Sequence, residues 1–436
     1  MRLRPTRILA LLVAGAAAAS TLAAGPLSPA AATPLPDRAL SSAPESPRAA
    51  AAVFWRGSWA AAQQPLNPNA PGWAKQGFVN QSVRQVVRLT AGGTMVRVRL
   101  SNLYGTTPLR LTGASIARTS AGAAVERGSQ RNLTFAGRKW AQIPAGRELN
   151  SEPLRMATTA KERLTVTLYF AHRTGPATYH SRAIADSFRA AGDHRVDPGA
   201  GAYTRTAANW YYLTRIDVRG AQAQPRNGIV ALGDSLTDGH SSTHNGNNRY
   251  PDQLAERLIN NRTPRPVLNA GISSNRLLTR SPCGGEAATA RFRRDVALQP
   301  GARTVIVLVG TNDIRQQAGT TRCAEGAPRI TAQRLIDGHR YLIRWAHERG
   351  LRAVGATVPP CGCIGTNETI RTQLNQWIRR TAGTSSGYDA LADFDRALAD
   401  PHRPNTLRPA YDSGDHVHPN NTGYDRMARA VPLTKL

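Results

Sequence analysis

The feature that most constrains the fold is a change in hydrophobic pattern at Gly228. Before this residue, apolar and polar side chains alternate in short runs, which is typical of antiparallel strands with one buried face. After it, short and wholly apolar runs are separated by helical patterns, which is typical of a parallel sheet covered on both faces. The chain of 436 residues is long enough for two cores, so we predict two structural regions.

The first predicted region is a β-rich, sandwich-like accessory domain over 53–220. Five of the seven tryptophans lie in it. Buried tryptophans are common in such cores, but exposed ones could also bind sugar rings by stacking, and the sequence leaves both interpretations open. The alternating runs that predict its strands are Val83 to Leu89, Met95 to Leu100, Leu109 to Ile116 and Leu164 to Phe170.

The second predicted region, 228–436, is an α/β domain with a parallel sheet. In such sheets the chemistry lies at the carboxyl ends of the strands. We expect strands at Ile229 to Leu232, Val267 to Leu268, Thr304 to Val309 and Leu351 to Val358, and helices at Tyr250 to Asn260 and Ile330 to Arg349.

The first residues have the pattern of an exported protein. Basic residues at Arg2, Arg4 and Arg7 precede an apolar, alanine-rich stretch and then small residues, so we predict a secretory signal peptide over 1–32. A retained membrane anchor is the alternative. Residues 33–52 are rich in Ala, Pro and Ser and are predicted to be a linker. We therefore expect a secreted, extracellular protein without a transmembrane segment.

Export changes the meaning of the four cysteines, because disulfides are the default in an oxidising compartment. Cys283, Cys323, Cys361 and Cys363 allow three pairings, and the sequence does not choose among them. A ring closed between Cys361 and Cys363 would be strained but stays possible. The paired C-x-x-C spacing of many zinc sites is absent from the sequence.

The formal net charge of +28 suggests an anionic partner. Only four of the 56 basic residues are lysines, and the arginines are scattered rather than clustered. No base-reading motif is present, so we predict no specific nucleic-acid binding, while loose association with anionic polymers or the cell envelope is compatible with this surface.

A serine follows the first predicted parallel strand, in the sequence Gly233-Asp234-Ser235-Leu236. A serine hydroxyl becomes a strong nucleophile only when a base removes its proton, and the base needs a group that orients it. Near the C-terminus, Asp415 lies three residues before His418 and could hold one nitrogen of its ring. His416 is the alternative base, and Ser235 could instead be a turn or helix-capping residue.

Acyl transfer also needs hydrogen-bond donors for the oxyanion. Gly271 and Asn312 each follow a predicted strand and could supply a backbone N–H and a side-chain amide, beside the N–H of Ser235. Asn312 could also be a structural turn residue, and Asp234 is expected to bond the backbone of its turn. His240 and His244 could line the cleft or be solvated loop residues.

With these motifs in place, the chain resembles the SGNH/GDSL hydrolases, a family of serine esterases and lipases, over about 228–436. Gly233-Asp234-Ser235, Gly271, Gly310-Thr311-Asn312-Asp313 and the Asp415/His418 pair match its four blocks. The resemblance implies a three-layer flavodoxin-like domain without metal or cofactor. It implies Ser235, Asp415 and His418 as catalytic residues and Ser235, Gly271 and Asn312 as the oxyanion hole. Ser274 departs from the pattern, since many members have a second glycine there.

The layout of the chain is also similar to a secreted bacterial branch of this family associated with acetyl xylan esterases, on the basis of Gly57-Ser58-Trp59-Ala60 and Tyr411-Asp412-Ser413-Gly414. This resemblance implies removal of acetyl or other short acyl groups from carbohydrate or small esters. A lipase or phospholipase acting on longer acyl chains is the first alternative. An inactive, secreted glycan-binding module is the alternative from another class.

Two other enzyme classes were weighed against this interpretation. A metal site could draw on Asp238, His240, His416 and His418, although no H-E-x-x-H motif is present. An α/β-hydrolase would need glycine where this chain has Thr237, so its G-x-S-x-G elbow is absent. Walker and dinucleotide-binding fingerprints are absent too.

Overall fold

The structure, a computed structural model, describes residues 54–220, 225–317 and 321–436. The predicted signal peptide 1–32 and the whole of the predicted linker 33–52 lie outside the described residues. The predicted linker boundary at residue 52 and the start of the β-rich region at 53 are likewise outside them. In the described part of the chain, no helix has both the length and the apolar character that a membrane crossing requires.

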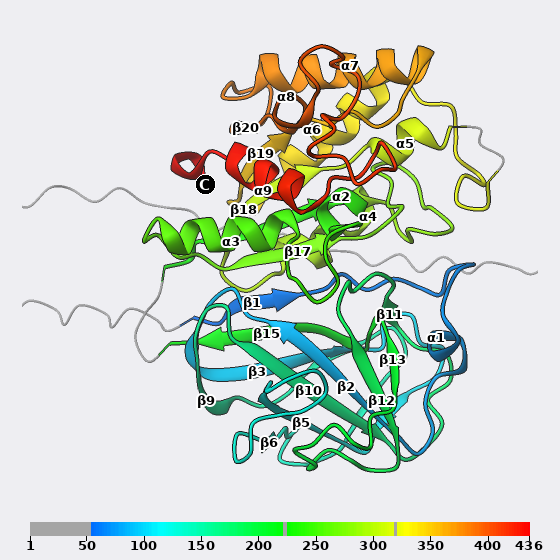
Figure 1. The fold of residues 1–436 in the computed structure, drawn as a ribbon, viewed down its shortest axis with the longest axis vertical. Coiled ribbons are helices and arrows are strands. Elements are labelled where there is room, and N and C mark those ends of the chain that lie inside the picture. Colours follow the sequence, from blue (N-terminus) through cyan, green and yellow to red (C-terminus); the bar gives the residue numbers. More distant parts are fainter. Residues whose placement is uncertain (1–53, 221–224, 318–320) are drawn as a thin grey trace, which may run out of the picture. The chain divides into compact units, whose positions relative to one another are not determined.

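Two large antiparallel sheets form most of the first region, as its alternating pattern predicts, and β11-β14 and β4-β7 form two small ones (Figure 1). One has the strand order β1-β15-β3-β8, with β9 also paired to β3, and the other has the order β13-β12-β2-β10-β5-β6. The elements are β1 (Arg56–Ala60), α1 (Gly72–Gln76), β2 (Gln81–Arg88), β3 (Gly93–Ser101), β4 (Leu109–Leu111), β5 (Gly113–Arg118), β6 (Arg131–Asn132), β7 (Ala141–Ile143), β8 (Glu148–Asn150), β9 (Leu154–Thr158), β10 (Arg163–Phe170), β11 (Tyr179–His180), β12 (Ser187–Ala191), β13 (Arg205–Ala207), β14 (Trp210–Tyr211) and β15 (Leu213–Arg219).

Strand β3 shows why this region folds as it does. Val96, Val98 and Leu100 are fully buried, while Arg97 and Arg99 between them point to the other face and pair with acidic side chains of neighbouring strands. Apolar residues from both sheets belong to one core cluster, so the two sheets bury their apolar faces together. The predicted run from Leu109 to Ile116 is divided into β4 and β5, which pair with different strands.

Two tryptophans of this region are core residues rather than ligand platforms. Trp59 and Trp210 are more than nine-tenths buried, and their rings meet edge to face at a centroid distance of 4.8 Å. Trp140, in contrast, is about half exposed. The core interpretation therefore holds for Trp59 and Trp210.

A five-stranded parallel sheet forms the second region, in the order β17-β16-β18-β19-β20. The first strand along the chain is therefore the second in space, which is the order of flavodoxin-like sheets. The elements are β16 (Gly228–Gly233), α2 (Ser235–Asp238), α3 (Tyr250–Asn260), β17 (Val267–Gly271), α4 (Ala288–Phe292), η1 (Arg293–Ala297), β18 (Ala302–Leu308), α5 (Thr311–Arg315), α6 (Ala332–Glu348), β19 (Arg352–Ala356), α7 (Gly365–Thr381), β20 (Ala390–Ala392), α8 (Phe394–Leu398), α9 (Asn421–Ala430) and η2 (Leu433–Lys435).

Successive residues of the central strands point into two different apolar clusters. Val230 and Val305 pack in a cluster with residues of α4, α6 and α7, whereas Ile229 and Ile306 pack with residues of α3, α8 and α9. Helices therefore cover both faces of the sheet, as the wholly apolar strands predict. Successive side chains of a strand point to opposite faces of the sheet, so neighbouring residues of β16 pack in different clusters.

The two regions are joined by contacts as well as by the chain. Ala60 of β1 belongs to the same apolar cluster as Leu268 of β17. The Thr90 hydroxyl donates to the carbonyl of Val267 and accepts its N–H, each at 3.1 Å. Arg88 also pairs with Glu256 in a partly buried position. The antiparallel strands end at Arg219 and the parallel sheet begins at Gly228, but the described residues of both regions belong to one compact unit. The division into domains 53–220 and 228–436 stays a prediction.

Two disulfides take up all four cysteines, between Cys283 and Cys323 and between Cys361 and Cys363. This is one of the three pairings that the sequence allows, and it includes the short ring. Gly362, inside that ring, has a φ of +63°, a conformation that glycine adopts without steric cost.

Close packing at Gly355 gives a test of this fold. A Cβ there would overlap the ring of Tyr388, which is fully buried, so Gly355→Ala should lower the free energy of unfolding by about 1–3 kcal/mol. Gly199→Ala is the control, because a Cβ at Gly199 meets no atom within 4 Å. Denaturant unfolding of both variants measures the difference. Equal midpoints for the two variants would contradict the packing described.

Candidate active site

Ser235 lies where β16 turns sharply into the short helix α2. The Asp234 side chain begins this helix by accepting a hydrogen bond from the Leu236 N–H at 3.0 Å, the structural role expected for it. Gly233 is required before the turn, because a Cβ there would collide with the Leu308 carbonyl and the Thr237 side chain. The turn leaves the Ser235 side chain partly exposed at the carboxyl end of the sheet.

His418 lies between Ser235 and Asp415 in an unbroken line of hydrogen bonds. Its Nε2 is 2.7 Å from the Ser235 hydroxyl, and its Nδ1 is 2.6 Å from Oδ2 of Asp415. The other oxygen of Asp415 accepts the backbone N–H groups of His418 and Val417 at 2.8 and 3.0 Å, which fixes the carboxylate. The structure therefore brings Ser235 together with His418, 183 positions later in the sequence, and with Asp415 beside it.

His416, the alternative base, points elsewhere. Its Nδ1 is 2.6 Å from a carboxylate oxygen of Asp412, and its side chain is 80% exposed, compared with 12% for His418. An aspartate therefore pairs with a following histidine twice, at a spacing of four residues for His416 and of three for His418, but only His418 meets the serine.

The surroundings shift the pKa values of both ionisable partners of Ser235. Burial lowers the pKa of His418; Asp415 opposes this shift, and the positive charges of Arg315 and Arg182 add to it. The pKa of Asp415 is also lowered, because its hydrogen bonds to His418 and Val417 outweigh the opposing effect of burial. At neutral pH the imidazole of His418 is thus a neutral base beside a carboxylate.

His240 stacks on His418, with ring centroids 4.1 Å apart and an angle of 15° between the planes. Burial, followed by the charges of His418 and Arg182, lowers the pKa of His240 to about 4. Its ring is therefore neutral at pH 7 and forms one wall of the site. His244 lies away from this wall and pairs with Asp186 at 2.7 Å.

Asn312 is the second residue of helix α5, shortly after β18, and is buried. Its amide nitrogen donates to the Asn275 carbonyl at 3.0 Å, and its oxygen accepts from Gln316 at 3.1 Å. An amide nitrogen carries two protons, so one of them is left for another acceptor. The N–H of Ser235 has no acceptor among the described residues.

Gly271 does not have a free donor. Its N–H donates to the side chain of Asn269 at 2.8 Å, and that side chain is itself held by the Thr237 carbonyl. Since a backbone amide carries one proton, the N–H of Gly271, the oxyanion donor expected from the sequence, already has its acceptor in this structure. The glycine is needed for packing instead, because a Cβ would collide with the backbone of Asp238.

Ser274, three residues further on, has a backbone N–H that is free in the described part of the chain and that the sequence did not single out. In the loop after β17, the N–H groups of Ile272, Ser273 and Asn275 all have acceptors, whereas that of Ser274 has none among the described residues. Ser274 has a φ of +64°, which explains why a glycine is common at this position of the N-x-G-x-x-G pattern. The serine in place of the second glycine of this pattern was the feature of the sequence that pointed to position 274.

Arg291 supports the ends of both strands from below. Its guanidinium is fully buried and donates to the carbonyls of Gly233 and Ala270 at 2.8 and 2.7 Å, and to the side chain of Asn275 at 3.0 Å. Asp295 balances its charge at 3.1 Å. The Arg291 side chain therefore ties together the end of β16, which leads to Ser235, the end of β17, and the loop that follows β17.

The residues weighed for a metal do not form a suitable site. His240, Asp415 and His418 have ligand atoms within 4.8 Å of one another, but the two rings are nearly parallel, so their lone pairs do not converge. Both nitrogens of His418 are also in hydrogen bonds. Asp238 and His416 bond other partners.

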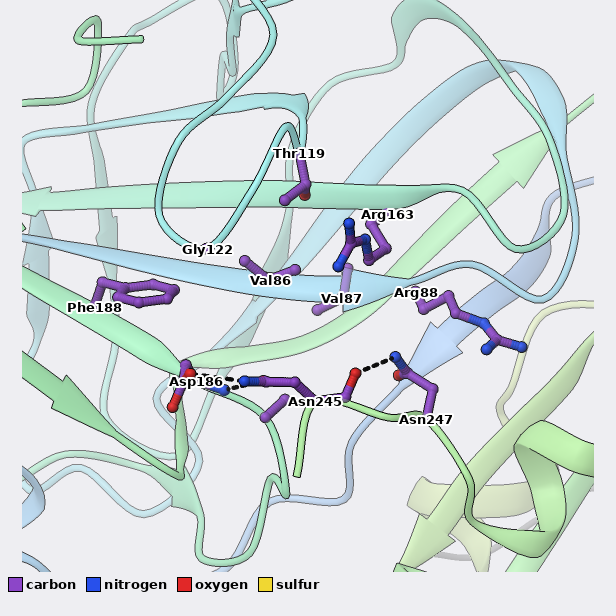
Figure 2. A pocket seen from close by; sticks show the side chains of 11 residues that line it. Val86, Val87, Arg88, Thr119, Gly122, Arg163, Asp186, Phe188, Asn245 and Asn247 are labelled. Atoms are coloured by element: carbon purple, nitrogen blue, oxygen red, sulfur yellow. Dashed lines mark hydrogen bonds between the residues drawn. The ribbon is translucent and has the colours of Figure 1, made fainter. Parts of the chain in front are cut away.

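A separate cavity of about 90 Å³ lies between the second antiparallel sheet and the loop after α2 (Figure 2). None of its lining residues belongs to the cluster around Ser235. The lining includes Val86, Arg88, Thr119, Arg163, Asp186, Phe188, Asn245 and Asn247.

Residues 231–426 match the sequence model of the family described as GDSL-like lipase/acylhydrolase. This part of the chain belongs to that family, which confirms the resemblance drawn from the motifs, and the protein is a carboxylic ester hydrolase. No curated protein matches the chain.

Several solved structures are similar to about half of the chain. A GDSL-like lipase from Bacteroides thetaiotaomicron is 19% identical, with a TM-score of 0.35, over 48% of this chain and 89% of that one. An acetyl xylan esterase variant from Geobacillus stearothermophilus is 20% identical, with a TM-score of 0.35, over 47% and 93%. These values do not define a substrate for this chain.

The lowered pKa of His418 predicts the pH dependence of ester hydrolysis. The acid limb of kcat/KM should have its midpoint below about 6.5, the ordinary histidine value, because the base must be neutral to accept a proton. Arg315→Gln removes a positive charge that lowers this pKa, so the midpoint should move to higher pH. Arg315→Lys is the matched control and should leave it in place. A shift to lower pH in Arg315→Gln would contradict this account.

Proposed function

We propose that the protein is a secreted serine ester hydrolase that works through an acyl-enzyme and removes acetyl or other short acyl groups from carbohydrate or small esters. The observation that carries this proposal is the line of hydrogen bonds from Asp415 through His418 to Ser235. Export is supported by the signal-like pattern of residues 1–32 and by the two disulfides.

In the proposed mechanism, Oγ of Ser235 attacks the ester carbonyl while Nε2 of His418 takes the serine proton. Asp415 holds the ring and stabilises the imidazolium. The carbonyl carbon becomes tetrahedral, and its oxygen takes the negative charge. When the C–O bond breaks, His418 gives the proton to the leaving alcohol, and an acyl group remains on Ser235. Water then attacks the acyl group with His418 as base, which releases the acid and restores the serine.

Three donors are proposed for the oxyanion: the N–H groups of Ser235 and Ser274 and the remaining amide proton of Asn312. Ser274 takes the place first expected for Gly271. This assignment is supported by the unused N–H groups of Ser235 and Ser274 and by the bond from Asn312 to the carbonyl of Asn275, which ties the amide to the same loop.

A short acyl group is supported by the polar character of the site. His240 stacks on His418, and the charges of Arg182 and Arg315 act on His418, whereas a long acyl chain needs an extended apolar groove. The lipase alternative is therefore the weaker one. An inactive glycan-binding module would not need a serine, histidine and aspartate held within hydrogen-bond distance of one another.

Hydrolysis of p-nitrophenyl esters from acetate to palmitate tests the proposal. Ser235→Ala and His418→Ala should each lower kcat by about 10⁴-fold or more, because nucleophile and base act as one unit. His416→Ala is the matched control and should keep its activity. Activity should resist a chelator and be highest with acetate. Activity that survives in Ser235→Ala would overturn the proposed mechanism, and preference for palmitate would make the lipase alternative the better one.

Asn312→Ala tests the oxyanion assignment separately. Loss of one donor should lower kcat about 10²–10³-fold and leave KM nearly unchanged, because the bond to the oxyanion forms only in the transition state. Circular dichroism and thermal unfolding establish that the variant is folded. An Asn312→Ala protein with normal folding and normal turnover would remove Asn312 from the oxyanion hole.

A further inference from the structure

Asp238, at the end of α2, holds the loop that contains Ser274. Its Oδ2 accepts both the backbone N–H and the hydroxyl of Ser273, at 2.9 and 2.7 Å. Because Ser273 is bonded twice to a buried carboxylate, the backbone of the adjacent Ser274 is held in place. The orientation of the unused Ser274 N–H therefore depends on where the carboxylate lies.

The other oxygen of Asp238 is held by a side chain from the antiparallel region. Nε2 of His180, on β11, is 3.0 Å from Oδ1 of Asp238, and both side chains are only 3% exposed. The edge of the His180 ring thus meets a residue 58 positions later in the sequence.

Both nitrogens of His180 face groups that can only accept a hydrogen bond. Nδ1 is 2.8 Å from the carbonyl of Ala62, and Nε2 faces Asp238 and, at 3.2 Å, the carbonyl of Arg182. Each nitrogen must therefore carry a proton, which makes the ring a cation. The aromatic ring of Trp210 packs beside it at a centroid distance of 5.4 Å. The pair is a buried imidazolium and carboxylate with its hydrogen bonds satisfied.

We propose that His180 is a positioning residue for ester hydrolysis, which fixes Asp238 and through it the Ser273–Ser274 segment of the oxyanion hole. This inference rests on the proposed function. It makes the antiparallel region a part of the catalytic apparatus, because that region supplies the cation that holds the loop.

Removal of His180 would leave a buried carboxylate without its counter-ion. Such a carboxylate takes up a proton or draws in water, and either change alters the bonds to Ser273. A donor displaced by a fraction of an ångström stabilises an oxyanion less well, although substrate binding in the ground state is little affected. The expected signature is a fall in kcat without a matching rise in KM.

The chain offers a matched control for this test. His244 pairs with Asp186 at 2.7 Å and also joins the parallel-sheet region to the antiparallel one. This pair is exposed, with 47% and 28% of the two side chains accessible, and neither residue bonds the 271–275 loop. A loss that came only from separating the two regions would affect both pairs.

The experiment compares His180→Ala with His244→Ala in the full-length protein. A fluorophosphonate that labels Ser235 to completion counts the folded active sites, and p-nitrophenyl acetate hydrolysis then gives kcat per labelled site. We expect His180→Ala to lower kcat per site about 10–100-fold with KM changed less than about threefold, and His244→Ala to match the unmodified protein. Normal kcat per site in His180→Ala, or an equal fall in His244→Ala, would overturn the proposal.

A double variant separates a positioning role from a general structural one. If His180 acts through the oxyanion hole, the loss in His180→Ala/Asn312→Ala should be smaller than the product of the two single losses. Losses that multiply would overturn the proposal. If His180→Ala does not fold, Ser273→Ala removes one bond to Asp238, and unchanged kcat per site there would also overturn it. Retained activity in Ser235→Ala would instead show that the proposed function itself has failed.

Discussion

The parallel pairing of β16 with its two neighbours determines where the rest of the site lies. Gly233 stands beside Gly271 of β17 on one side and beside Leu308 of β18 on the other. The three strands end at one edge, so the residues that follow them meet although they lie far apart in the sequence. Arg291 bonds the carbonyls of two of these strand ends, and its buried charge is balanced by Asp295. The site therefore rests on a sheet edge that is closed by hydrogen bonds.

The parts of the site that the sequence predicts are those fixed by local rules. Ser235 and Asn312 each lie within a few residues after a strongly apolar strand, and the three-residue spacing of Asp415 and His418 places a carboxylate next to the ring by local geometry alone. The strands and the two long helices were predicted for the same reason, because their periods are visible in short windows. Short elements such as β20 and α8 have too few residues to show a period.

The parts that the sequence did not predict depend on single contacts. The side chain of Asn269 accepts the N–H of Gly271 two residues on, a local hydrogen bond that the sequence permits but does not require. The pair of His180 and Asp238 joins two regions with different hydrophobic patterns, and their separation is not a period of any element. The disulfide pairing is of the same kind, since three pairings are chemically equal until the chain is folded.

The two buried histidines near the site have pKa values shifted in opposite directions, and this limits the pH range in which the site is complete. Burial and the charges of Arg315 and Arg182 lower the pKa of His418. As the pH rises, this base therefore loses its proton before the pH reaches the ordinary histidine pKa. Burial also acts to lower the pKa of His180, but Asp238 and the carbonyls of Ala62 and Arg182 outweigh it and raise the value. A raised histidine pKa gives stability that is fully present below the unfolded value and is lost as the pH rises through the folded one. A neutral His418 and a cationic His180 therefore coexist between these two values, and that range includes the ordinary histidine pKa.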